Sequence, residues 1–299
     1  MEIKFKVFRY NPERDERPYY KDFAIDMKKG STILDAMHRI KEEKDGSFTF
    51  RRSCRSNICG SCAIKVNGQS LLACKTQISE ASINGQILLE PLDNMRVIKD
   101  LVVDMEIFWD KIKGVRPWLS TGYEKELPSS EFRMEPAAIK ERDATSNCIF
   151  CGVCFSACET MLINKRYMGP TAIAKCYRFV SDPRDNLGPK RVDTLIALTG
   201  ESLWLCADCH NCEEFCPKKV KVREAGDHLR QIATERGFIH QGFKTQVEEL
   251  VKRGRLLEIS EFETAMREKY KLPPIPPTSQ GSIALIKRTR ILNKIEESQ

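Results

Sequence analysis

Twelve of the thirteen cysteines in this 299-residue chain fall into three tight groups, and this grouping constrains the fold more than any other feature. The groups are Cys54, Cys59, Cys62 and Cys74; Cys148, Cys151, Cys154 and Cys158; and Cys206, Cys209, Cys212 and Cys216. Grouped thiols form disulfides in secreted chains and bind metal in reducing compartments. The opening MEIKFKVFRY is interrupted by charges and is no secretory signal, so metal ligation in reduced cytoplasm is predicted.

The first group has the spacing C-x4-C-x2-C with a distant fourth cysteine, which is the plant-type [2Fe-2S] pattern. Gly60 lets the backbone approach such a cluster without a Cβ clash, and the hydroxyls of Ser53 and Ser61 can donate hydrogen bonds to sulfur. Arg51, Arg52 and Arg55 add positive charge beside this loop. These arginines are either a solvated face or a docking and tuning surface.

The second and third groups share the spacing C-x2-C-x2-C-x3-C, and Pro217 follows the last cysteine. In two-cluster bacterial ferredoxins the first three cysteines of such a run hold one cluster and the fourth crosses to the other. By that rule one site is Cys148, Cys151, Cys154 and Cys216, and the other is Cys206, Cys209, Cys212 and Cys158. The crossing predicts two helical hairpins that face each other.

Structural zinc is the main alternative, because paired C-x2-C knuckles also bind that metal. Zinc needs only four thiolates, and its coordination gives no reason why the third cysteine follows at x2 and the fourth at x3 in both runs. Cys176 is the thirteenth cysteine and is expected to be buried in a helix. His210 lies inside the third group, where it is either incidental, or tunes a potential or delivers a proton to a quinone.

The hydrophobic spacing predicts a small α+β unit followed by helices. Residues 2–9 and 20–27 alternate as two antiparallel strands, and residues 33–40 form a helix capped by Ser31 or Thr32. Further strands are expected at residues 62–66 and 86–90, with Asn67-Gly68 as a tight turn, and a second helix is expected to open at Asn94.

The domain limits follow from these patterns. Residues 1–113 are predicted to form the first domain, residues 114–136 a proline-containing linker, residues 137–242 a helical domain, and residues 243–299 an extension. The extension has helical patterns at 243–253, 259–270 and 283–294, and its Pro-Pro pairs between 272 and 277 suit a strap across a partner.

Charge and hydropathy exclude other classes of function. The net charge is +7, but its 49 basic and 42 acidic residues are interspersed, so no nucleic-acid partner is expected. No stretch approaches the roughly 18 to 20 apolar residues of a membrane span. There is neither a dinucleotide-binding glycine motif nor a nucleophile elbow, so the chain alone is expected to move electrons without transforming a substrate.

The order of these motifs resembles the iron-sulfur subunit of succinate dehydrogenases and fumarate reductases over about residues 1 to 240. The shared features beyond the cysteines are Arg51 to Arg55, Gly60-Ser61, Ile87 to Pro91, Asp93, Asp100 to Asp104, Gly169-Pro170, Tyr177 to Phe179, Asp182, Arg184-Asp185 and Pro217-Lys218. The resemblance implies a plant-type ferredoxin domain of β-grasp fold and an all-α bacterial-ferredoxin-like domain that holds two cubane clusters.

The resemblance also implies partners. A flavoprotein with FAD exchanges two electrons with succinate or fumarate, and the clusters pass them singly toward a quinone-side partner. The [2Fe-2S] site is then nearest the flavin, and the Cys206 site is nearest the membrane. Attachment is expected to be peripheral, on the inner face of the cytoplasmic membrane, through these partners.

Two departures from the common family pattern are visible. Common members have an apolar residue and a [3Fe-4S] cluster where Cys209 stands, so a second [4Fe-4S] cluster is predicted here. Common members also continue after the Cys158 position with proline and a tryptophan pair of the quinone pocket, whereas Glu159 to Leu162 stand here. Both departures resemble an unusual branch, whose third subunit is similar to a heterodisulfide reductase component rather than a heme-bearing membrane anchor. A quinone or thiols could then be the acceptor.

Two other readings remain open at this point. The chain could be the iron-sulfur subunit of another flavoenzyme, such as a glycolate oxidase or a thiol-linked fumarate reductase. It could also be a non-redox scaffold that clusters or zinc stabilise, although three sites exceed what folding needs.

Overall fold

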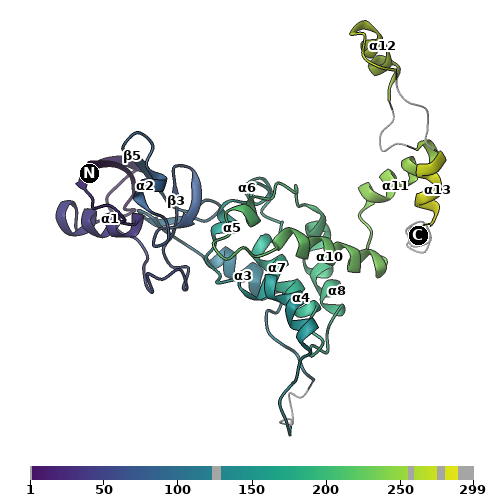
Figure 1. Ribbon diagram of the computed structural model, residues 1–299, viewed down its shortest axis with the longest axis horizontal. Helices are drawn as coiled ribbons and strands as arrows, with labels where there is room; N and C mark the ends of the chain where they lie inside the picture. The colour runs from purple at the N-terminus through teal and green to yellow at the C-terminus, as the bar shows by residue number, and fades with distance from the viewer. Residues whose placement is uncertain (1, 123–128, 255–258, 275–279, 289–299) are drawn as a thin grey trace. The chain divides into compact units, whose positions relative to one another are not determined.

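The computed structural model describes residues 2–122, 129–254, 259–274 and 280–288. The chain forms two compact units, residues 1–229 and residues 230–299 (Figure 1). The first unit contains all thirteen cysteines.

The β-sheet of the first unit has five strands within residues 2–122, in the order β2-β1-β5-β3-β4. β1 (Glu2–Arg9) pairs antiparallel with β2 (Tyr19–Asp26) and parallel with β5 (Gln86–Glu90). β3 (Ala63–Val66) pairs antiparallel with β5 and with β4 (Gln69–Leu72). The alternation predicted for the first strand is confirmed, since Ile3, Phe5 and Val7 are all buried. The turn at Asn67-Gly68 is also confirmed, whereas β4 was not predicted.

Helix α1 (Ile33–Arg39) buries the apolar face that the sequence predicts. Thr32 is its N-cap: the Thr32 hydroxyl accepts a hydrogen bond from the Asp35 amide at 3.2 Å, and the Asp35 carboxylate accepts one from the Thr32 amide at 2.8 Å. This capping box satisfies two backbone donors that a helix start leaves free. The π-helical segment η1 (Ile40–Lys44) continues α1, and the short helix α2 (Ile78–Ala81) precedes β5.

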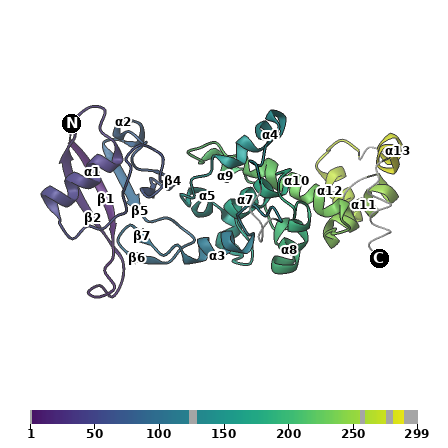
Figure 2. The same ribbon diagram turned by 90° about the horizontal axis from the view of Figure 1, so that it is seen from below.

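The prediction of a helix that begins at Asn94 is wrong over the first half of that segment. Strands β6 (Val97–Lys99) and β7 (Val102–Val103) form a short hairpin there, and helix α3 begins only at Glu106 and ends at Gly114 (Figure 2). The buried Asp100 carboxylate explains the hairpin, because it accepts hydrogen bonds from Arg9, at 2.9 Å, and from the Thr49 amide, at 2.8 Å. A helix would withdraw this carboxylate from both donors.

The remainder of the first unit is helical, as predicted. Its helices are α4 (Pro136–Ser146), α5 (Val153–Ser156), α6 (Glu159–Ile163), α7 (Pro170–Val180), α8 (Lys190–Thr199), the 3-10 helix η2 (Gly200–Trp204), α9 (Asn211–Glu214) and α10 (Val222–Glu235). Helix α10 continues across the limit between the two units. Helix α7 contacts α3, α4, α5 and α8 and is buried along most of its length (Figure 2).

Hydrogen bonds join the sheet region to these helices. The Ser156 hydroxyl lies 2.8 Å from the Ser70 hydroxyl and accepts a hydrogen bond from the Asp93 amide at 2.8 Å. The Asn94 side-chain amide donates to the carbonyl oxygens of Phe155 and Cys158 at 2.9 and 3.0 Å. These contacts fix the α5 cysteine loop against the sheet.

Residues 115–122 and 129–135, which lie within the predicted linker, contain no helix or strand. Arg191, which is buried, holds the start of this segment: its guanidinium donates to the carbonyl oxygens of Arg116 and Trp118 at 2.7 and 2.8 Å, and to the Asp185 carboxylate.

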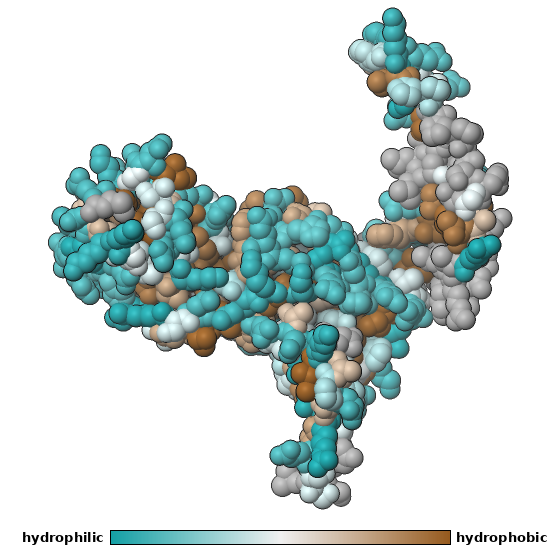
Figure 3. Space-filling view, in the orientation of Figure 1, coloured by the Kyte–Doolittle hydropathy of each residue, from teal (hydrophilic) through white to brown (hydrophobic). Residues whose placement is uncertain are grey.

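The second unit contains α11 (Gln241–Arg253), α12 (Glu261–Lys269) and α13 (Gln280–Arg288), which match the first two predicted helices and part of the third. The prolines after residue 274 and the end of the third pattern lie outside the described residues. In the first unit, hydrophilic side chains cover most of the face seen in Figure 3. Among the described residues, no helix has the length and apolar character needed to cross a membrane.

Candidate metal centres

The first cysteine group lies on the loop before β3. Cys54 is at its centre: the Cys54 sulfur accepts hydrogen bonds from the backbone amides of Ser56, Ile58 and Cys59 at 3.3, 3.4 and 3.3 Å. Gly60 has a φ of +73°, which helps the chain to turn around this sulfur. Three backbone donors aimed at one sulfur stabilise a thiolate and adjust the potential of a cluster bound to it.

The β3–β4 hairpin brings the distant fourth cysteine to this group. Ala63 pairs with Leu72 across the hairpin, so Cys62 and Cys74 lie at its open end. The Cys74 amide donates to the Cys62 sulfur at 3.4 Å. The strand that was missed in the sequence is therefore the one that carries the fourth candidate ligand to the loop.

The thiols of this group differ in environment. A hydrogen bond from Ser61 lowers the pKa of Cys59 to about 6, whereas burial raises the pKa of Cys62 to about 12. Arg51, Arg52 and Arg55 are exposed around the loop. The Arg55 guanidinium lies 3.2 Å from the His38 ring, and burial together with Arg55 and Arg52 lowers the pKa of His38.

The second centre is assembled from segments far apart in the sequence. Cys148, Cys151, Cys154 and Cys216 line one small cavity, together with Thr171 and Pro217. Burial, with smaller contributions from the neighbouring Cys148 and Cys216, raises the pKa of Cys151 to about 12. The fourth cysteine of the third run thus lies with the first three cysteines of the second run.

The third centre receives the reciprocal cysteine. Burial raises the pKa of Cys158, and the nearby Cys206 and Cys209 contribute to the same increase. Burial likewise raises the pKa of Cys212 to about 12, with added contributions from Cys206, Cys158 and Cys209. The structure therefore brings together the two crossed sets that the spacing predicts.

Ligation of clusters by these sets remains a prediction. Within the described residues, no three His, Cys, Asp or Glu side chains are arranged as ligands of a metal ion. The donor chemistry suits iron-sulfur clusters, because each set consists of four cysteine sulfurs and no carboxylate or imidazole.

The structure adds three side chains that sequence patterns did not mark. The Thr171 hydroxyl lies 3.1 Å from the Cys154 sulfur. Lys175 is buried near Cys148 and lies over the ring of Phe150. Tyr167 is buried, and burial raises the pKa of its phenol, with further contributions from Cys206 and Cys158. Helical periodicity gives no signal for such neighbours, because all three are brought to the cysteines by tertiary packing.

Two other predicted residues lie as follows. Cys176 is buried in α7, as expected, and burial raises its pKa to about 12. His210 is exposed and has a φ of +63°, and its carbonyl oxygen accepts hydrogen bonds from Glu213 and Glu214 at the start of α9. Its proposed roles in proton delivery or tuning remain predictions.

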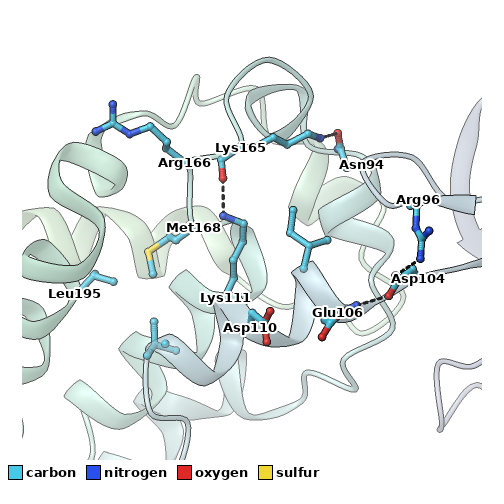
Figure 4. Close-up of a pocket in the computed structure, with 13 residues that line it drawn as sticks. Asn94, Arg96, Asp104, Glu106, Asp110, Lys111, Lys165, Arg166, Met168 and Leu195 are labelled. Carbon is cyan, nitrogen blue, oxygen red and sulfur yellow. Dashed lines mark hydrogen bonds and ion pairs between the residues drawn. The ribbon is translucent and has the colours of Figure 1, made fainter.

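A cavity of about 710 Å³ lies between Asn94, Lys111, Lys165 and Leu195. Polar contacts line it: Arg96 forms an ion pair with Asp104, Lys165 donates to the Asn94 side-chain oxygen, and the Lys111 ammonium donates to the Lys165 carbonyl at 2.7 Å (Figure 4). No cysteine is among the described residues that line it. It is separate from the candidate metal centres.

Comparison with known proteins agrees with the two-part architecture. Residues 4–110 match the family described as a 2Fe-2S iron-sulfur cluster binding domain, and residues 144–220 match the 4Fe-4S dicluster domain. The chain is 37% identical over 235 residues to succinate dehydrogenase [ubiquinone] iron-sulfur subunit 1, mitochondrial, of Oryza sativa subsp. japonica, covering 77% of this chain and 82% of that protein. The chain belongs to the succinate dehydrogenase and fumarate reductase iron-sulfur subunit family.

Bacterial members of the family align similarly. The fumarate reductase iron-sulfur subunit of Haemophilus influenzae is 34% identical over 79% of this chain and 98% of its own length. The solved structure titled "Mycobacterium smegmatis Sdh1 complex in the apo form" has the same fold, with a TM-score of 0.71, 22% identity, and coverage of 80% of this chain and 98% of that chain. The expected α+β fold, with its ferredoxin-like sheet domain and helical dicluster domain, is confirmed.

Proposed function

We propose that this iron-sulfur subunit carries electrons one at a time between the FAD of a partner flavoprotein and a quinone-side partner. Its family membership makes it an electron-transfer subunit of a succinate dehydrogenase or fumarate reductase complex. The observation that carries the specific proposal is the exchange of Cys158 and Cys216 between the second and third cysteine runs. A zinc-stabilised scaffold has no need for such an exchange.

The twelve grouped cysteines are the proposed ligands. Cys54, Cys59, Cys62 and Cys74 hold a [2Fe-2S] cluster, and Cys148, Cys151, Cys154 and Cys216 hold a [4Fe-4S] cluster. The third set is Cys206, Cys209, Cys212 and Cys158. When bound, each cluster accepts and releases one electron. The protein contributes buried thiolates, hydrogen bonds to sulfur and a close approach between the loops that carry the first and second sets.

The third cluster is proposed to be a second [4Fe-4S] rather than a [3Fe-4S]. Cys209 supports this assignment because it supplies a fourth sulfur beside Cys206 and Cys158. Its exposure on the surface also suits a centre that delivers electrons to a partner.

The partners follow from the family and from the surface. A flavoprotein with FAD docks near the exposed arginines of the first loop, and the third subunit is a membrane anchor or resembles a heterodisulfide reductase component. The complex is bound peripherally to the inner face of the cytoplasmic membrane through these partners. We also retain residues 1–113, 114–136, 137–242 and 243–299 as the proposed domain limits.

A tagged copy purified anaerobically tests the proposal. The expected result is a brown complex that contains a flavoprotein and reduces fumarate or oxidises succinate. The Cys158→Ser and Cys216→Ser variants should each lose iron, whereas Cys176→Ser should keep it. A colourless, zinc-loaded preparation, or full iron content in both crossed variants, would contradict it.

A further inference from the structure

Helix α7 presents two polar side chains to the second cysteine set. Thr171 and Lys175 are four residues apart and therefore lie on one face of the helix. Thr171 lines the cavity of that set together with Ala174, and Lys175 is the next residue along the chain. Both polar side chains are buried, with exposures of 2% and 7%.

The Lys175 ammonium lies in a setting that is unusual for a lysine. Among the residues that the structure describes, no carboxylate lies within ion-pair distance of it, and its ammonium sits 4.5 Å from the centre of the Phe150 ring. Buried lysines are rare unless paired. The aromatic face fixes the ammonium by a cation–π contact, and Phe150 is itself inside the second cysteine run.

The Phe150 ring that holds this ammonium lies between Cys148 and Cys151 in the chain, and a cysteine that ligates iron carries negative charge. Burial lowers the pKa of Lys175, and the Cys148 thiolate opposes that shift. The ammonium is thus held beside the second cysteine run, in a buried region of low dielectric where its charge can act on a bound cluster.

The Thr171 hydroxyl makes a second contact to the same set, 3.1 Å from the Cys154 sulfur. A cysteine that ligates iron has lost its proton, so only the hydroxyl can donate in this pair. Hydrogen bonds to sulfur and nearby positive charge both stabilise the more negative, reduced form of a cluster.

We propose that Lys175 and Thr171 form a potential-setting face on α7 that raises the reduction potential of the cluster held by Cys148, Cys151, Cys154 and Cys216. Neither residue is a ligand. Lys175 acts through its charge and Thr171 through its hydrogen bond. The inference rests on the proposed cluster at this set, and it makes that cluster a better electron acceptor than four buried cysteines alone would.

The test is a potentiometric titration of the complex, purified anaerobically and followed by electron paramagnetic resonance. The signal of this cluster is the one that Cys148→Ser alters. In Lys175→Met, the ratio of reduced to oxidised cluster at the wild-type midpoint should fall about tenfold, which is 59 mV for a one-electron couple. Lys175→Arg, which keeps the positive charge, should show the wild-type ratio. Thr171→Val should shift it in the same direction, and Thr171→Ser should not.

The controls separate this inference from the proposed function. The [2Fe-2S] midpoint should be unchanged in every variant, and Lys113→Met, at an exposed lysine, should change no midpoint. If Lys175→Met loses iron, Lys175→Gln is titrated in its place. If neither Lys175 variant retains the cluster, the midpoint of Thr171→Val decides the test. A retained cluster whose ratio stays within twofold of the wild type overturns the inference alone. Wild-type protein without this cluster overturns the proposed function as well.

Discussion

Gly60 of the first cysteine loop lies directly against Cys151 of the second. A Cβ atom added at Gly60 would lie 2.6 Å from the Cys151 Cβ and 2.8 Å from its Cα. The two residues belong to different predicted domains. The loops approach each other so closely at this point that a side chain on residue 60 would overlap Cys151. The loops that carry the first and second cysteine sets therefore touch at a position where only glycine leaves room.

Gly60→Ala should push the two loops apart. Overpacking of this kind costs about 1 to 3 kcal/mol, in addition to the strain of alanine at positive φ. We expect a lower thermal midpoint for loss of cluster absorbance and slower reduction of the second cluster in rapid-freeze experiments. Gly85→Ala is the matched control, because Gly85 has a φ of +75° and no atom within 4 Å of an added Cβ. Equal effects in both variants would show that backbone strain alone is responsible.

Cys209→Ala should convert the third cluster from [4Fe-4S] to [3Fe-4S]. Three sulfurs then remain for a cluster that needs four to hold its last iron. The oxidised variant should gain a strong [3Fe-4S] resonance that the oxidised wild type lacks. Cys176→Ala, which removes the buried spare thiol, should give the wild-type spectrum. A [3Fe-4S] signal in intact wild-type protein would contradict the assignment.

The cysteine sets were predictable from spacing, whereas the contacts around them were not. The spacing C-x2-C-x2-C-x3-C predicts that the fourth cysteine of each run joins the other cluster. The alternation of Ile3, Phe5 and Val7 predicts a half-buried strand. The Gly60 contact joins residues about ninety positions apart, and no local pattern encodes it. Similarly, Lys175 reads in sequence only as a polar helical residue.

The error at Asn94 has a physical cause. The apolar residues from Val97 to Met105 suit helical spacing and short strands equally well. A buried carboxylate decides between them: Asp100 bonds Arg9 and Thr49, which are distant in sequence. Asn94 also has a φ of +67°, which a helix start does not need. Tertiary hydrogen bonds thus override a valid hydrophobic period.

Asp182→Asn should destabilise the helical part of the first unit. The Asp182 carboxylate is fully buried and pairs with Arg142, Arg178 and Arg184 at 2.7, 2.7 and 2.9 Å. Removing a charge from a buried network costs about 3 kcal/mol, or a fall of roughly 6 to 12 °C in thermal midpoint. Asp110→Asn, which breaks an exposed pair with Lys113, should cost under about 1 kcal/mol. Equal midpoints for the two variants would contradict this role.

The same carboxylate gives a direction of pH dependence. Hydrogen bonds from Arg184 and Arg178 outweigh burial and hold the pKa of Asp182 below its ordinary value. The Asp182 carboxylate therefore contributes fully to the free energy of unfolding when the pH is above its ordinary pKa. This contribution is lost as the pH falls toward the lowered pKa. The stability difference between wild type and Asp182→Asn, followed by denaturant unfolding, should narrow as the solution is acidified. A difference that widens would contradict the sign.

Cys59 should be the fastest-alkylated thiol in its loop when the chain is free of iron. Its pKa of about 6 makes it a thiolate at neutral pH, whereas Cys62, at about 12, stays protonated. Labelling with iodoacetamide, mapped by mass spectrometry, should level off above pH 7 at Cys59 and keep rising at Cys62. Ser61→Ala should slow Cys59 labelling, and Ser53→Ala should not. Equal labelling of the two cysteines would refute the difference.

The presence of three clusters on one chain is tested most directly by Mössbauer spectroscopy of the iron-57-labelled, anaerobically purified complex. We expect about ten irons per chain, divided between one [2Fe-2S] and two [4Fe-4S] components. A spectrum without a [2Fe-2S] component, or one whose cubane iron accounts for a single cluster, would contradict it.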